Sequence, residues 1–226
     1  MTLSQFVAEF NAYPKFGQLL QKRDLAIEQR EQFLRLYPPA DIENCLRFRQ
    51  QAENFVKWLE GPLYWLGGIN LHSNQPVITA GNKRDQLIHL LKRSFAADRT
   101  VFQKVDLPWG QIPYFGDEAS DRQIAKKIIC TYYPDDTVPI FNTEHMEHFV
   151  RCLGLGPARD SLTLERFGSS YGGNLTVGRR WEILTTLLLA EKQKIAVTAS
   201  EDNVYLMYCL YYSSASPLGF KPSDPH

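Results

Sequence analysis

Apolar side chains recur at three- and four-residue intervals along most of this chain, a spacing typical of amphipathic α-helices. Helices are predicted over 2–10, 14–37 and 39–59. Pro38 and Pro39 separate the last two, because proline removes a backbone donor and clashes with the preceding helical turn. Two long helices joined by so short a break predict an antiparallel helical hairpin.

The pattern changes between Gly61 and Gly81, where Gly, Asn, Ser and Pro interrupt short apolar pieces. These residues favour turns, so we expect a loop or a small hairpin there. The later segments show helical periodicity again, with start signals from small polar residues. Helices are predicted from Asn82, over 117–133, over 142–153, and after Thr176 and Ser200, with a short strand over 194–198.

The predicted fold is therefore mainly α, a helical domain of about eight helices with a small irregular or hairpin insertion. It is expected to occupy residues 1–212, and a division into lobes 1–110 and 111–212 is one arrangement of it. Residues 213–226 are rich in Ser, Pro, Gly and Asp, which bury too little apolar area to offset the entropy lost on ordering. They predict a flexible tail or linker.

The composition excludes several classes of protein. The chain has 25 basic and 25 acidic residues, so its overall field does not attract nucleic acid, and any such contact needs a local patch. No apolar run approaches the roughly 18 residues that span a bilayer, and the first ten residues lack the order of a signal peptide. A cytoplasmic location without membrane partners is expected. The four cysteines lie outside CxxC pairs, which favours reduced thiols.

Sequence motifs for catalysis are missing. No Gly-Lys-Ser/Thr loop for a nucleotide is found, and the glycine-rich run 168–173 lacks the lysine that such a loop needs. His145 and His148 are spaced to share a metal ion, but a third ligand is missing nearby. Asp135 and Asp136 follow a proline, as in a turn. We therefore predict a protein that is not an enzyme, with no catalytic residue, metal or cofactor.

The clearest candidate for binding is a cluster of cations on the helix predicted from Asn82 and just after it. A cluster of this kind releases counterions from phosphates and so favours nucleic acid. A solvated helix face is the plainer interpretation. The candidate nucleic-acid-binding residues are Lys83, Arg84, Lys92, Arg93, Arg99 and Lys104.

Three stretches resemble a known family. They are 55–60 together with 66–69, then 125–140, and then 144–154. The sequence there is similar to the N-terminal recognition module that precedes the AAA+ motor in McrB-like restriction ATPases. In that family a helix ends in an aromatic-Pro-Asp turn, Pro-Ile follows, and a helix containing His closes with Leu-Gly.

The matching residues here are Pro134, Asp135, Pro139, Ile140 and His145. Pro134 is suited to end one helix, Pro139 to hold an extended corner and Ile140 to enter the core. We interpret this structural motif as a packing motif rather than a catalytic one.

The resemblance implies a DNA-recognition module of a restriction or antiviral defence system, which supplies target specificity to a separate motor and nuclease. Its implied partners are DNA, modified or not, and AAA+ ATPase and nuclease subunits. A second hypothesis is a protein-interaction or oligomerisation module without nucleic-acid binding, using exposed aromatic residues. Those residues are Trp65, Trp109, Tyr114 and Phe115. A third hypothesis is a glycosylase-like DNA-processing enzyme.

Overall fold

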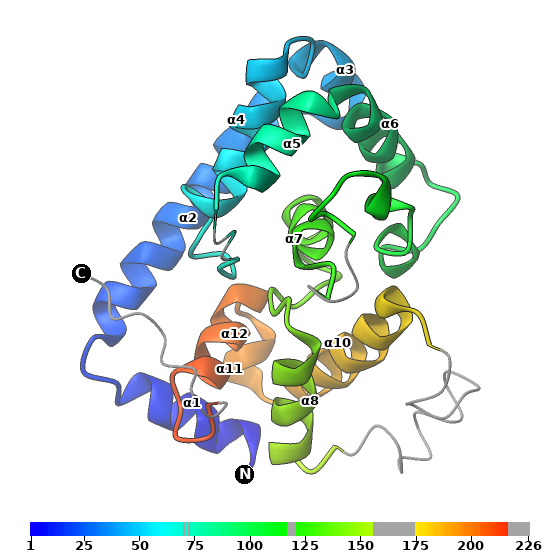
Figure 1. Cartoon of the computed structure of the whole chain (residues 1–226). Helices are drawn as coiled ribbons and strands as arrows, with labels where there is room; N and C mark the ends of the chain where they lie inside the picture. The colour runs from blue at the N-terminus through cyan, green and yellow to red at the C-terminus, as the bar shows by residue number, and fades with distance from the viewer. Residues whose placement is uncertain (70, 72, 117–120, 156–174, 217–226) are drawn as a thin grey trace. The chain divides into compact units, whose positions relative to one another are not determined.

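The computed structural model describes residues 1–69, 71, 73–116, 121–155 and 175–216. Within these residues the chain forms eleven α-helices and three short 3-10 helices, and no strand (Figure 1). The mainly α fold predicted from the apolar spacing is confirmed. The described residues contain no helix with the length and apolar character needed to cross a membrane.

The chain divides into two compact units, and the division falls within helix α2 (Phe16–Leu36). The first unit contains residues 1–23 and 134–226, and the second contains residues 24–133. These limits do not coincide with lobes 1–110 and 111–212, because both ends of the chain belong to the same unit.

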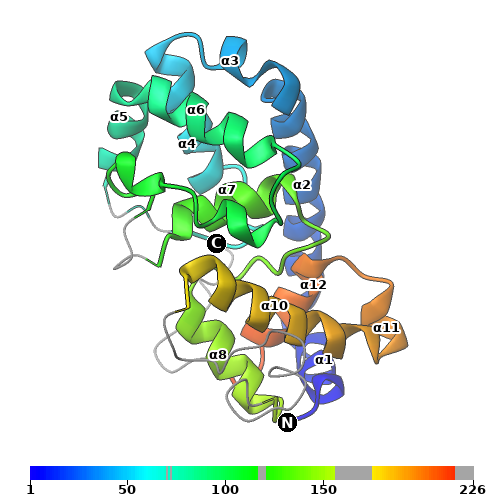
Figure 2. The same ribbon diagram turned by 90° about the vertical axis from the view of Figure 1, so that its right-hand side faces the viewer.

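In the first unit the terminal helices pair with each other. Helix α1 (Leu3–Asn11) packs on α12 (Asn203–Tyr211), and α8 (Thr143–Cys152) packs on α10 (Val177–Gln193), as Figures 1 and 2 both show. The short α11 (Ala196–Ala199) follows α10. Aromatic rings fill the space between α1 and α12, since the Phe10 ring lies within 6.1 Å of four other rings. These belong to Phe16, Tyr205, Tyr208 and Tyr212.

Helix boundaries in this unit follow the signals in the sequence. The Asn142 side chain accepts from the backbone N–H groups of the first turn of α8, and Gly154 beyond its end adopts φ +74°. The Thr176 hydroxyl caps α10 in the same way. Asp202, rather than Ser200, caps α12.

The second unit contains the rest of α2 and a series of shorter helices. Helix α5 lies along α4, and α3 lies near α6. The elements after α2 are η1 (Pro39–Asp41), α3 (Ile42–Cys45), α4 (Arg49–Glu60), α5 (Gln75–Asn82), α6 (Arg84–Phe95), η2 (Phe102–Lys104), η3 (Trp109–Gln111) and α7 (Gln123–Tyr132).

Three local predictions are wrong. The helix expected over 39–59 is broken into η1, α3 and α4. Part of the loop or hairpin expected over 61–81 is helix α5, in which Pro76 lies in the first turn, where its missing N–H costs nothing. The strand expected over 194–198 is replaced by α11.

The corner after α7 is held by a single buried side chain. The Asn203 amide nitrogen donates to the carbonyls of Pro134, Asp135 and Thr137, at 2.9, 3.2 and 3.0 Å. Its oxygen accepts from Lys192 Nζ at 2.8 Å. Three backbone carbonyls that lie outside any helix after α7 thereby have a hydrogen-bond donor.

Within the same corner, Ile140 is buried, and its carbonyl accepts from the indole nitrogen of Trp181 at 3.2 Å. Pro139 and Ile140 are buried, Pro134 is partly covered and the Asp135 side chain is exposed.

The first residues of the predicted tail make contacts with two helices. Ser214 donates to both carboxylate oxygens of Glu9, at 2.6 and 3.0 Å, and the Ala215 carbonyl lies 2.6 Å from His148 Nε2. Residues 213–216 are thus tied to α1 and α8. Residues 217–226 lie outside the described part of the chain.

Candidate nucleic-acid interface

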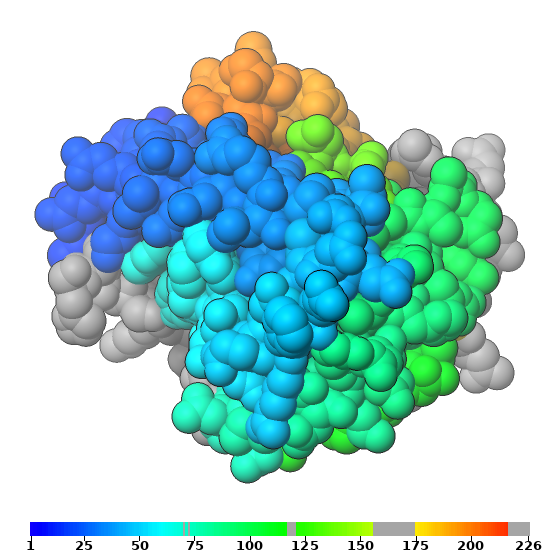
Figure 3. Space-filling model, turned by 90° about the horizontal axis from the view of Figure 1, so that it is seen from above, coloured from blue at the N-terminus to red at the C-terminus, as the bar shows by residue number. Residues whose placement is uncertain are grey.

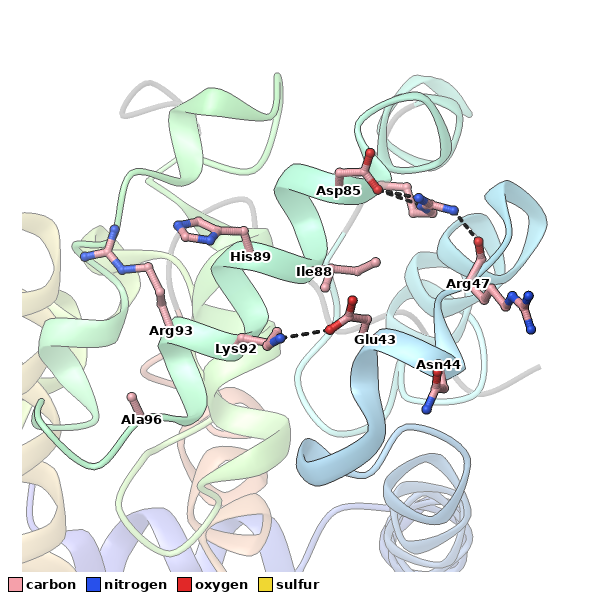
Figure 4. Close-up of a pocket in the computed structure, with 10 residues that line it drawn as sticks. Glu43, Asn44, Arg47, Asp85, Ile88, His89, Lys92, Arg93 and Ala96 are labelled. Atoms are coloured by element: carbon pink, nitrogen blue, oxygen red, sulfur yellow. Dashed lines mark hydrogen bonds and ion pairs between the residues drawn. The ribbon is translucent and has the colours of Figure 1, made fainter.

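A groove of about 760 Å³ lies between α3 and α6 in the second unit. In the space-filling view, the blue surface of α3 and α4 borders the green surface of α6 (Figure 3). The close-up in Figure 4 shows the side chains that line it. They are Glu43, Asn44, Arg47, Arg84, Asp85, Ile88, His89, Lys92, Arg93 and Ala96.

The groove is polar, with four cationic side chains against two carboxylates. Two of the cations already have anionic partners. Lys92 Nζ lies 2.8 Å from Glu43 Oε2, and Arg84 contacts both the Asp85 carboxylate and the Arg47 carbonyl. Part of the positive charge predicted for this helix is therefore neutralised by carboxylates within the groove.

His89 and Arg93 differ from these two. Neither side chain makes a hydrogen bond or an ion pair within the described residues, and both line the groove. In Figure 4 they lie on the opposite side of the Lys92–Glu43 pair from Arg47. Arg93 and Arg47 thus carry positive charge without an ion pair among the described residues, and the Lys92–Glu43 pair lies between them in Figure 4.

Sequence reasoning missed Arg47 and His89 as members of this group. Arg47 lies between α3 and α4, far from the predicted basic helix in sequence, and only the packing of α3 near α6 brings it there. His89 lies one turn before Arg93 on α6, so its helical spacing from Arg93 was available as a signal.

The remaining predicted cations do not line the groove. Lys83 is exposed at the junction of α5 and α6, and Arg99 Nε lies 3.8 Å from the Asp98 carboxylate. Lys104 is buried, so the prediction that it belongs to a surface patch is wrong. Its Nζ donates to the Ala96 carbonyl at 3.0 Å and to the Tyr133 hydroxyl at 2.9 Å, so its ammonium supports the fold.

Two further lysines are fully buried in helix α7. Lys126 Nζ pairs with Asp121 at 2.8 Å. Lys127 Nζ donates to the carbonyls of Leu63, Leu66 and Gly67, at 2.6, 3.0 and 2.7 Å, and burial lowers its pKa to about 7. Lys127 therefore closes the turns that follow α4. No sequence signal distinguishes these lysines from exposed ones.

The two histidines with metal-like spacing have other partners. His145 Nδ1 lies 2.9 Å from the Tyr211 hydroxyl, and burial lowers the pKa of this imidazole. His148 Nε2 lies 3.5 Å from Cys152 Sγ in addition to its contact with Ala215. In the described ranges, no three or more His, Cys, Asp or Glu side chains are grouped so that they could hold a metal ion. Residues 168–173 lie outside those ranges.

The aromatic residues of the protein-interaction hypothesis do not form one exposed surface. Trp109 and Phe115 are fully buried, and the indole nitrogen of Trp109 donates to the Lys104 carbonyl at 2.9 Å. Trp65 is partly covered and meets the Tyr64 ring edge-on. Only Tyr114 of the four is largely exposed. The prediction that these four residues form an exposed aromatic surface is therefore wrong.

Comparison with protein-family models, with curated proteins and with solved structures found no match to this chain.

Proposed function

We propose that this chain is a DNA-recognition module of a restriction or antiviral defence system, which binds DNA through the groove between α3 and α6. The observation that carries the proposal is that Arg47 and Arg93, two arginines without an ion pair among the described residues, line one polar groove. The resemblance to the recognition module of McrB-like ATPases supports the choice of DNA. Under this proposal the chain binds, and a separate ATPase and nuclease act.

Phosphate binding in this groove follows from simple electrostatics. Arginine donates several N–H groups in a planar fork that suits phosphate oxygens. Arg93 has no competing anionic partner among the described residues, so it is ready to bind. Lys92 is paired, but both members of its pair are largely exposed, and such surface pairs contribute only about 0–1 kcal/mol. A phosphate can therefore replace Glu43 as the partner of Lys92.

The two carboxylates in the groove limit this affinity. Glu43 and Asp85 repel a nearby phosphate, so the chain alone is expected to bind DNA weakly and with strong salt dependence. Weak binding by one module suits a protein that works beside a motor, because linked modules gain affinity from effective concentration.

The test is the binding of a fluorescent duplex DNA at several salt concentrations, measured by anisotropy. Arg47→Glu and Arg93→Glu are each expected to weaken binding roughly tenfold and to lower the slope of log K against log salt by about 0.9 per lost phosphate contact. Arg35→Glu is the matched control, because Arg35 lies on α2, is exposed and does not line the groove.

One further variant in the same assay should bind DNA more tightly than the unsubstituted protein. Glu43→Gln removes a negative charge and frees Lys92, so tighter binding is expected. DNA binding that is absent for both duplex and single strand, or that Arg35→Glu weakens as much as Arg93→Glu does, would count against the groove.

A protein-interaction module remains the second candidate because two leucines of α2 are exposed. Leu25 and Leu36 are 52% and 47% exposed, and their spacing of about three helical turns places them on the same face. If this face of α2 is an interface, light scattering should show self-association or a stable complex that Leu25→Ser with Leu36→Ser abolishes. A monomeric protein with unchanged mass at high concentration, and no loss of partner binding in the double variant, would remove this candidate.

A further inference from the structure

Phe48 is a large aromatic side chain that the fold leaves in water. It is 61% exposed, although apolar residues of this size are usually covered in the folded protein. The guanidinium of Arg47 lies over its ring, 5.6 Å from the centroid. A cation above one part of an exposed ring forms a mixed surface that is both flat and positively charged.

The backbone that carries this ring is held in place. The Phe48 N–H donates to the Gln51 side chain at 2.9 Å, and its carbonyl accepts from the N–H groups of Gln51 and Ala52, at 3.0 and 3.3 Å. Phe48 therefore begins helix α4 as a fixed position rather than part of a loose loop. A fixed attachment lowers the entropy that a ring loses when it stacks on a ligand.

The ring adjoins the cationic groove. Arg47 is one of the residues that line the groove, and its carbonyl accepts from Arg84 of α6, while its guanidinium points away from α6 in Figure 4. Phe48 is the next residue and its ring lies under the Arg47 guanidinium, so an exposed aromatic face and one cation adjoin the edge of the groove.

We infer that Phe48 stacks against an unpaired nucleobase, so that the groove takes a single-stranded segment of DNA in preference to a continuous duplex. Phenylalanine has no hydrogen-bonding group with which to read the edge of a base, and it offers only a face. In duplex DNA the base faces are covered by their neighbours, whereas a single strand exposes them. The cations beside the ring then hold the backbone of the same strand. This inference rests on the proposed function and states which form of DNA the groove prefers.

The experiment compares a labelled oligothymidine of about 12 nucleotides with a duplex of the same length, using the complete chain and anisotropy. The unsubstituted protein should bind the single strand more tightly. Phe48→Ala should weaken single-strand binding about 5- to 100-fold, the range for loss of one base–aromatic stack, and should change duplex binding less than twofold. Leu36→Ala is the control, since it also shortens an exposed apolar side chain but lies outside the groove.

Two more variants separate stacking from simple apolar contact. Phe48→Trp keeps an aromatic face and should retain single-strand binding, whereas Phe48→Leu keeps apolar bulk without that face and should behave like Phe48→Ala. Circular dichroism of each variant shows whether it is folded, and exposure of the ring makes a folding defect unexpected.

The outcomes distinguish the two proposals. Salt-dependent duplex binding with no preference for the single strand, or equal losses on both DNA forms in Phe48→Ala, overturns the stacking role and leaves the proposed function standing. Equal single-strand binding by Phe48→Leu and the unsubstituted protein overturns it as well. If neither DNA form binds at low salt, both proposals are overturned.

Discussion

At the scale of single residues, lysines of the same chemical type have opposite roles in this protein. Lys92 is exposed and paired with Glu43, whereas Lys104 and Lys127 are buried and donate to oxygen atoms of the second unit. A long side chain can place its ammonium several ångströms from its own backbone, so the helical face of a lysine does not determine the environment of its charge. Counting cations along the basic helix therefore overestimates the charge that DNA would meet.

Lys127 has a measurable effect on stability. Replacing it with methionine, Lys127→Met, leaves three buried carbonyls without this donor and should lower the free energy of unfolding by about 2–4 kcal/mol. Urea unfolding followed by circular dichroism measures the change. Lys57→Met, at an exposed position on α4, is the control and should differ little from the unsubstituted protein.

The difference in unfolding free energy between the unsubstituted protein and Lys127→Met should depend on pH. Burial lowers the pKa of Lys127 from 10.5 to about 7, so between these values the unfolded chain binds one proton more than the folded protein. Stability then rises with pH, and the advantage over Lys127→Met should widen from pH 7 to about pH 10, by up to about 1.4 kcal/mol per unit. A stability difference that stays constant over this range would show that the three carbonyls keep Lys127 protonated in the folded protein.

At the scale of elements, one glycine explains why a predicted loop is a helix. A Cβ at Gly81 would lie 2.6 Å from Glu53 Oε1 and 2.9 Å from Arg49 Cγ. The missing side chain therefore lets α5 lie close along α4. Glycine in a sequence usually suggests a turn, but here it serves the contact between two helices.

The corner between α7 and α8 depends on Asn203 at the start of α12. Asn203→Ala removes the donor to three carbonyls and the acceptor for Lys192, so it should destabilise the protein by about 2–4 kcal/mol. Chemical denaturation measures this cost. Asn44→Ala, at an exposed site on α3, should cost far less.

Equal effects of these two asparagine substitutions would contradict the role assigned to Asn203. Unchanged DNA binding by folded Asn203→Ala is also expected, because Asn203 belongs to the first unit and the groove belongs to the second.

At the scale of the whole molecule, a balanced net charge coexists with an uneven local distribution. The basic and acidic residues are equal in number, yet Arg47, His89 and Arg93 share one groove. The candidate DNA surface lies wholly in the second unit.

The sequence by itself determined the helical class and many helix ends. Periodic apolar residues, capping by Asn142 and Thr176, and the left-handed glycine after α8 all act over a few residues, so they can be read from the chain directly. Arg84, Lys92 and Arg93 were found in the same way, because they share one helix.

Only the tertiary structure decided which residues line the groove and which of the predicted cations are paired or buried. Arg47 reaches the groove through the packing of α3 near α6, Glu43 neutralises Lys92 there, and Lys104 is withdrawn into the interior. These outcomes depend on contacts between residues distant in the chain. Local spacing carries no information about such contacts, because burial and ion pairing follow from how the helices pack.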